Sequence, residues 1–419
     1  LKTAFAEKTA NDDLVATSQL AGLETRGTTI TDTTVNAADI NTIDTATTGV
    51  VTVNSTTVTG LSADIQTAFD GNTVANRTAN LAAQAITVTD TITVAQANAH
   101  AADTTGVVTA TISEQSFTGA TNLTQLSTAA SETTAGGDTR NAYTITVADA
   151  TVDAANLGTL LTQTTGSITV NSGTVFGSNA ELIAANNSNQ ISSFAAKNLT
   201  VDAGTVNTTE ANTLSAITTG VVTATITTGN IASFANLAET NNAFSTTVND
   251  GSLDASALNT LNAKTAGGVI TVSATTITGT ASDIATAYAA NLAGTIAGLG
   301  NETVTINNTG TVSASEINSI NAATSGVVTL TGVTRVTGTA ADINTAYAAN
   351  AVGTIAGLGD EAVTITGTTS AAADINTANT NTTGVVTVDS TTITGTTAQL
   401  TTLYAANTAG TVTGLGNEA

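Results

Sequence analysis

The chain contains no cysteine, proline, methionine or tryptophan, and its only histidine is His100. Without cysteine there can be no disulfide, thiol nucleophile or thiolate metal site, and a single imidazole excludes a multi-histidine metal centre. Basic residues are also scarce: 8 Lys and Arg stand against 31 Asp and Glu, so the net charge is −23. This balance argues against nucleic acid or an anionic membrane as a partner, and no apolar run approaches the ~20 residues that span a membrane.

The residues that are present indicate a folded chain. Of the 419 residues 41% are hydrophobic, and the mean hydropathy is +0.21. Valine, isoleucine, leucine and alanine alternate in short patterns with threonine, unlike the composition of disordered segments. At ~150 residues per domain the length suggests two or three domains, but internal repeats take precedence over that estimate.

A short step from Thr, Ser or Ala through Gly into a Val- or Ile-containing run recurs along the chain. Its glycines are Gly49, Gly106, Gly166, Gly220, Gly267, Gly326 and Gly384. The intervals between them are 57, 60, 54, 47, 59 and 58 residues, and a second glycine step falls within most intervals. The pattern predicts a double repeat of about 57 residues, made of two related halves of about 28.

Each half predicts two strands and a short helix. Residues 51–53 and 57–59 alternate valine with threonine, which is the period of a half-buried strand, and residues 54–55 form a corner between them. Apolar residues one helical turn apart, such as Ile343 and Tyr347, predict the apolar face of a helix. We expect the glycine that opens the next strand pair to act as a helix C-cap or turn.

Acidic residues recur near the expected helix starts, three positions after a capping side chain. Thr339 with Asp342 and Ser313 with Glu316 fit the capping box. The recurring acids are Asp39, Asp64, Asp283, Asp342, Asp374 and Glu316. Helix capping is the favoured role, and Ca²⁺ ligation is the alternative. Outside the repeat, 11–13 (Asn-Asp-Asp) and 249–250 (Asn-Asp) are further Ca²⁺ candidates that fit ordinary loops equally well.

One unit of this kind cannot bury its own apolar face, whereas stacked copies can. We therefore predict an α/β repeat fold: an elongated parallel solenoid of about 14 strand-corner-strand-helix coils with right-handed crossovers. A single continuous array of about seven double repeats should cover residues 1–419, divergent over 1–264 and regular over 265–419. The alternative is a row of small α/β domains of about 57 residues each, which would have little core. Both ends fall inside the pattern, so we expect a segment of a longer repeat protein.

The most regular stretches, 383–400, 325–350 and 357–365, resemble the large β-strand-repeat proteins of marine cyanobacteria. The resemblance is close over about residues 265–419 and looser before them. It implies a secreted or cell-surface structural protein, and it supplies no catalytic, cofactor-binding or metal-binding residues.

Two further features have a structural and a functional interpretation. His100 occupies the place that Ile43 and Ile320 hold in other repeats, so a partly buried substitution is favoured over catalysis. Threonine pairs such as Thr276 and Thr278 fit an exposed strand face, and an ice-binding array is the alternative. Several Asn-x-Ser/Thr triplets allow glycosylation but are expected by chance in this composition.

These observations favour a non-enzymatic structural protein of an extracellular filament, surface layer or adhesin stalk. It would act through length and self-association, because exposed strand edges favour pairing with another chain. It would need no cofactor. The alternatives are an adhesin that binds glycans, Ca²⁺ or ice, and a segment of a viral tail fibre; a polysaccharide lyase is disfavoured because basic residues are so few.

Overall fold

The computed structural model describes residues 3, 22–73, 77–127, 140–238 and 241–416. Contacts divide the chain into two compact units. Unit 1 comprises residues 1–203 and 217–220, and unit 2 comprises residues 204–216 and 221–419. Among the described residues, no helix is both long enough and apolar enough to cross a membrane.

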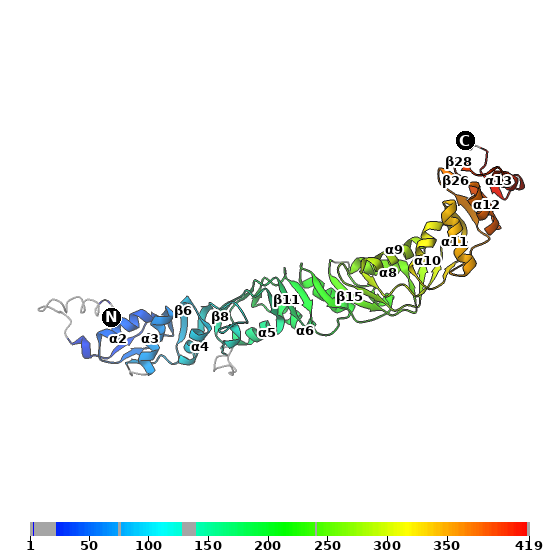
Figure 1. The fold of residues 1–419 in the computed structure, drawn as a ribbon. Coiled ribbons are helices and arrows are strands. Elements are labelled where there is room, and N and C mark those ends of the chain that lie inside the picture. The colour runs from blue at the N-terminus through cyan, green and yellow to red at the C-terminus, as the bar shows by residue number, and fades with distance from the viewer. Residues whose placement is uncertain (1–2, 4–21, 74–76, 128–139, 239–240, 417–419) are drawn as a thin grey trace. The chain divides into compact units, whose positions relative to one another are not determined.

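Unit 1 alternates short strands with short helices (Figure 1). Its helices are η1 (Leu23–Thr25), α2 (Ala37–Ala46), α3 (Ser62–Thr73), α4 (Val94–Asp103), η2 (Leu123–Gln125), α5 (Ala154–Gln163) and α6 (Asn179–Asn187). Its strands are β1 (Thr28–Ile30), β2 (Thr34–Asn36), β3 (Val51–Val53), β4 (Thr57–Gly60), β5 (Thr78–Ala79), β6 (Ala85–Ile92), β7 (Val108–Ile112), β8 (Ala142–Val147), β9 (Thr151–Asp153), β10 (Ile168–Val170), β11 (Thr174–Gly177), β12 (Ile191–Ser192) and β13 (Asn198–Val201).

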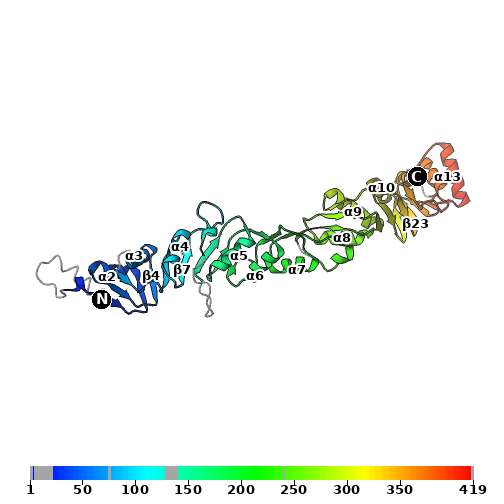
Figure 2. The same ribbon diagram turned by 90° about the horizontal axis from the view of Figure 1, so that it is seen from below.

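Unit 2 has the same alternation, and helices α8 to α10 follow one another in chain order (Figures 1 and 2). Its helices are α7 (Thr208–Ile217, whose last residue is counted with unit 1), η3 (Ile231–Phe234), α8 (Ala255–Lys264), α9 (Ala281–Ala293), α10 (Ala314–Ala323), α11 (Ala340–Val352), α12 (Ala372–Asn381) and α13 (Thr397–Ala409). Its strands are β14 (Val222–Thr225), β15 (Ala243–Val248), β16 (Ser252–Asp254), β17 (Ile270–Val272), β18 (Thr276–Gly279), β19 (Ile296–Ala297), β20 (Thr303–Ile306), β21 (Gly310–Ser313), β22 (Val328–Leu330), β23 (Val333–Gly338), β24 (Ile355–Ala356), β25 (Ala362–Ile365), β26 (Thr369–Ala371), β27 (Val386–Val388), β28 (Thr392–Thr394) and β29 (Val412–Thr413).

The described strands of both units pair in parallel. In unit 1 the strand orders are β1-β3-β5, β2-β4-β6-β7-β8-β10-β12 and β9-β11-β13. In unit 2 they are β14-β15-β17-β19, β16-β18-β20-β22-β24, β21-β23-β25-β27-β29 and β26-β28. The prediction of an α/β fold with parallel sheets is therefore confirmed, and the order of the strands is that of a solenoid-like repeat.

The core consists of ladders of β-branched side chains. Along the sheet from β21 to β29, five valines stand opposite one another, and all are buried: Val312, Val336, Val363, Val386 and Val412. Their neighbours in sequence point to the other face, because side chains alternate along a strand. The valine–threonine alternation of the sequence thus places one valine of each strand inside the core.

The structure differs from the predicted strand-corner-strand-helix order in every second coil, where a coil means the strands that follow one helix together with the next helix. Two strands separate α8 from α9 and α10 from α11, as predicted, but three separate α9 from α10 and α11 from α12. The third strand, β21 or β26, begins a new sheet. Because the extra strand pairs outside the existing sheet, partners such as Ile277 and Val304 are 27 residues apart, and the next pair, Val304 and Val328, are 24 apart.

Candidate functional site

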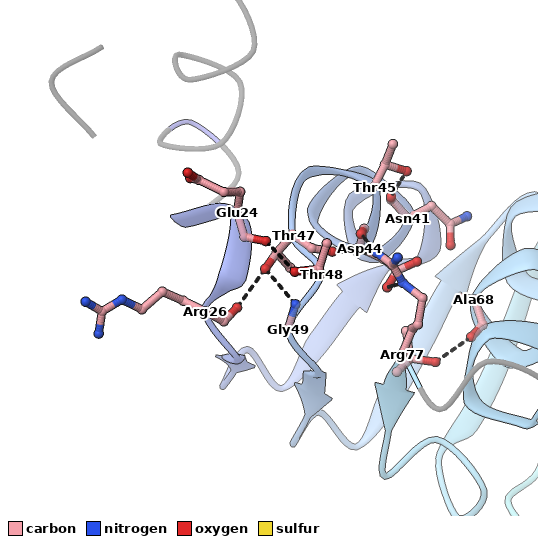
Figure 3. A network of polar contacts seen from close by, with 11 residues as sticks. Glu24, Arg26, Asn41, Asp44, Thr45, Thr47, Thr48, Gly49, Ala68 and Arg77 are labelled. Carbon is pink, nitrogen blue, oxygen red and sulfur yellow. Dashed lines mark hydrogen bonds and ion pairs between the residues drawn. The ribbon is translucent and has the colours of Figure 1, made fainter. Parts of the chain in front are cut away.

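The ends of the short helices are tied to the preceding coil by a threonine and a glycine. After α2, the Thr47 hydroxyl donates to the carbonyl oxygen of Arg26 at 2.8 Å and accepts from the N–H of Gly49 at 3.0 Å. The N–H of Thr48 donates to the carbonyl oxygen of Glu24 at 2.6 Å. Figure 3 shows these contacts. We call this arrangement the threonine clasp; it links residues that are more than 20 positions apart.

The clasp recurs in both units with the same donors and acceptors. Each central threonine donates to a carbonyl of the preceding coil and accepts from the glycine N–H two residues later. The other central residues are Thr104, Thr164, Thr218, Thr324 and Thr382. Since a buried hydroxyl is costly unless it is hydrogen-bonded, the clasp explains why threonine occupies these largely buried positions.

The glycine of the clasp is required by close packing between coils. A Cβ atom on Gly326 would lie 2.2 Å from the carbonyl oxygen of Glu302, and one on Gly49 would lie 2.4 Å from that of Arg26. The structure places the C-cap of α10 at Thr324, two residues before Gly326. The predicted glycine C-cap is therefore corrected here: these glycines admit the neighbouring backbone. The longer helices α9, α11 and α13 do end at a left-handed glycine.

One of the few basic side chains reinforces the end of α2. The Arg77 guanidinium donates to the carbonyl oxygens of Asp44 and Thr47, and its Nε lies 3.0 Å from a carboxylate oxygen of Asp44 (Figure 3). Positive charge is favoured at the C-terminal end of a helix. Arg77 therefore joins its own coil to the preceding one.

A buried tyrosine–glutamate pair closes the longer coils of unit 2. The Tyr347 hydroxyl donates to the Glu361 carboxylate, whose second oxygen accepts from the N–H groups of Gly359 and Asp360 at 2.8 and 3.1 Å. Glu361 is 3% exposed. Tyr288 and Glu302 repeat the arrangement. Burial, reinforced by the neighbouring carboxylate, raises the pKa of both tyrosines, so they remain donors at neutral pH.

Sequence analysis did not identify this pair, although a signal was present. The tyrosine precedes the glutamate by 14 residues in both cases, and Tyr404 precedes Glu418 by the same spacing. Glu418 lies outside the described residues. The glutamate belongs to the recurring segment that starts Gly-Leu-Gly, in which Gly357 has a φ of 92° and a Cβ would lie 2.5 Å from the carbonyl oxygen of Leu330.

Successive helices of unit 2 are joined by asparagine side chains. In each case the amide nitrogen donates to a carbonyl in the first turn of the next helix at 2.9 to 3.1 Å. The four residues are Asn259, Asn318, Asn344 and Asn376. These contacts give the helical layer the same coil-to-coil continuity that the strand ladders give the sheets.

The recurring acids serve the helix starts in part. Thr280 accepts from the N–H of Asp283 and donates to its carboxylate at 2.6 Å, and Thr339 with Asp342 repeats this exactly spaced pair. The predicted capping box at Ser313 is wrong, because that side chain contacts Ser315 and caps no N–H group. The helix that holds Asp374 begins after Ala371, which has no capping side chain.

The remaining acidic positions differ in their surroundings. Asn36 caps α2 through the N–H of Ala38, one residue before Asp39. The backbone carbonyl of Asp64 accepts from Asn41.

The proposed Ca²⁺ candidates are not brought together in the described part of the chain. No group of three or more His, Asp or Glu side chains there is placed to hold a metal ion. The Asp250 carboxylate instead accepts from the N–H of Ile231, the first residue of η3, at 2.6 Å. Residues 11–13 lie outside the described residues.

The structure places His100 in the interior of unit 1, where it is 1% exposed on α4. Its Nε2 lies 2.8 Å from the Ser62 hydroxyl. The predicted burial at a position that other repeats fill with isoleucine is thus observed. The threonine pairs lie half-buried on strands, and the Thr276 and Thr303 hydroxyls are 3.0 Å apart on neighbouring strands.

Comparison with known proteins adds no relative to this picture: no family model, no curated protein and no solved structure matches the chain.

Proposed function

We propose that the chain is a non-enzymatic structural repeat protein of an extracellular filament, surface layer or adhesin stalk. In this proposal it is an elongated parallel solenoid, in which coils of about 28 residues are paired into double repeats of about 57. Its action is mechanical: each coil adds length, and the ends join to further copies. The support comes from the contacts just described, which connect one coil to the next.

The clasp, the tyrosine–glutamate pair and the asparagine contacts have one property in common. Each joins positions about 8 to 30 residues apart, and each recurs. Polar groups that serve a reaction would converge on one place and differ from their counterparts in other coils. Polar groups that maintain a stack must instead be repeated in every coil, as these are.

The observation that carries the proposal is the open face at β28 and α13. Tyr404 is 44% exposed, whereas its counterparts Tyr288 and Tyr347 are 7% and 4% exposed. Ile393 and Leu400 are likewise half-buried, although the residues that correspond to them in the two earlier repeats are fully buried. In those repeats the following coil covers the same surface: β20 pairs with β18, and α10 packs on α9.

The chemistry of this open face favours another coil of the same kind. Between residues 385 and 416 the only charged residue is Asp389, so a chain of net charge −23 meets little repulsion there. β28 is the last strand of its sheet, and β1 and β2 are terminal strands of theirs. Residues 28–46 also have the strand, strand, ten-residue helix order that follows β19 and β24. We therefore propose that the open face binds the β1–β2–α2 coil of a second copy.

Lysine at Ile393 and Leu400 should abolish this association. A charge at each position would have to be desolvated when the face is covered, so the double variant should sediment as a monomer at concentrations at which the unchanged chain forms larger species. Sedimentation velocity over a range of about 1 to 100 μM, the usual range for weak interfaces, measures the effect.

Leu292→Lys provides the matched control, because Leu292 is 90% exposed on α9 and lies away from the open face. It should associate like the unchanged chain. An unchanged chain that remains monomeric at the highest concentration, or equal association of all the variants, would contradict the proposed self-association.

The monomer itself should scatter as an extended particle. A compact globule of 419 residues has a radius of gyration of about 22 Å, and a solenoid of this length must exceed it clearly. Small-angle scattering of the Ile393→Lys, Leu400→Lys chain at low concentration separates the shape of one molecule from assembly. A radius near the globular value would rule out the elongated solenoid.

A further inference from the structure

His100 is an ionisable residue at a position that otherwise holds buried isoleucine. Ile43 and Ile320 occupy this place in α2 and α10 and are 3% and 1% exposed. His100 is equally buried, at 1%, on the side of α4 that packs against α3 and β6. The substitution changes an apolar contact between two coils into one whose charge depends on pH.

The hydrogen bonds of the imidazole suit only its neutral form. Nε2 is paired with the Ser62 hydroxyl at 2.8 Å, whereas Nδ1 is buried and has no hydrogen-bond partner among the described residues. A neutral ring can present Nδ1 as an acceptor, but a protonated ring carries a donor on both nitrogens. Protonation would therefore bury an N–H group without an acceptor, together with a positive charge.

The contact reaches beyond α4, because Ser62 is the first residue of α3. Its N–H donates to the Asp90 carboxylate on β6 at 2.8 Å. Gln66 on α3 bridges the two helices by donating to Asp70 and Asp103 at 3.0 and 3.2 Å. A displacement of His100 would consequently disturb the start of α3 and its link to β6.

The elements packed around His100 carry carboxylates and no basic residue. Asp103 is on α4, Asp64 and Asp70 are on α3, and Asp90 is on β6; η2 has no titratable group. Glu114, which follows β7, accepts from the N–H of Val94 at the start of α4.

Burial lowers the pKa of His100, although Asp103 and Asp90 act in the opposite direction. The neutral form is therefore favoured in the folded chain. Its contribution to stability is complete above about pH 6.5 and is lost as the pH falls through the lower folded-state pKa. Burial also raises the pKa of Asp103.

From this arrangement we propose that the contact between α3 and α4 is an acid-sensitive joint: protonation of His100 separates the two helices and opens this part of unit 1, while coils with isoleucine at the same position remain closed. The joint is independent of the self-association proposed above. It would make one defined segment of an otherwise uniform repeat respond to mild acid.

Amide hydrogen exchange between pH 7.5 and 5.0 tests the joint, after correction for the intrinsic exchange rate. Below pH 6.5 the opening constant of peptides from α3 and α4 should rise by about tenfold per pH unit until the folded-state pKa is reached. Peptides from α10, which contains Ile320, should show no such rise. In His100→Ile and His100→Asn the rise should disappear; the asparagine variant retains a neutral polar partner for Ser62 if isoleucine impairs folding.

Two results would overturn the proposal. One is an equal rise in the variants, which would assign the effect to the carboxylates. The other is a pKa of His100 at or above 6.5 in the folded chain, which NMR can measure directly because the chain has a single histidine.

Discussion

Alanine in place of Gly326 should lower the free energy of unfolding of unit 2 by about 3 kcal/mol, the upper part of the range for overpacking a close contact. The added Cβ would stand 2.2 Å from the carbonyl oxygen of Glu302 and 2.6 Å from its carbonyl carbon. Both atoms are backbone, so no side chain can rotate away. The coil must move as a whole, which also stretches the clasp made by Thr324.

Gly251→Ala is the matched control for this change. No atom lies within 4 Å of a Cβ at that position, and its φ is not in the left-handed region. The control should therefore change stability by less than about 0.5 kcal/mol. Urea denaturation followed by circular dichroism measures both variants, and hydrogen exchange of α10 locates the damage. Equal stability of the two variants would show that the coils are not packed as closely as described.

Removal of the buried carboxylate in Glu361→Ala should cost about 4 kcal/mol. The Tyr347 hydroxyl and the N–H groups of Gly359 and Asp360 would lose their acceptor, and each buried unpaired donor costs about 1 to 3 kcal/mol. The cavity left by the side chain adds to this cost, whereas water that enters the space reduces it.

Two neighbouring variants separate the parts of this effect. Tyr347→Phe leaves the two backbone donors of Glu361 in place and should cost about 1 to 2 kcal/mol. Asp360→Ala changes an exposed side chain next to the same carboxylate and should have little effect. Denaturation midpoints compare the three. If Asp360→Ala were as harmful as Glu361→Ala, the loss would reflect loop conformation and not the buried carboxylate.

Much of the local structure could be predicted from residues close together in the chain. The alternation at 51–53 and 57–59 identified β3 and β4, because a strand with one buried face has a period of two. Thr280 and Thr339 were recognised as helix caps, because a cap and its acid are three residues apart. Ser313 has the same spacing but caps nothing, since its hydroxyl is paired with Ser315.

Features that join separate coils were predicted poorly or not at all. The strand β21 between α9 and α10 was missed, because its three-residue alternation is too short to distinguish from a loop without its partner β23. The partner of Tyr347 is 14 residues away and across a turn, and the partner of His100 is 38 residues away. No local period specifies such distances.

By itself the sequence determined the class of secondary structure, the parallel α/β architecture and the absence of thiol and multi-histidine chemistry, because each of these depends on composition or on spacings of a few residues. The tertiary structure decided which backbone each glycine must approach, which carboxylate each tyrosine meets, and where a new sheet begins. Those outcomes depend on which residue, typically 20 to 30 positions away, stands opposite once the coils are stacked. Packing of successive coils selects that register, and the chain expresses it only when folded.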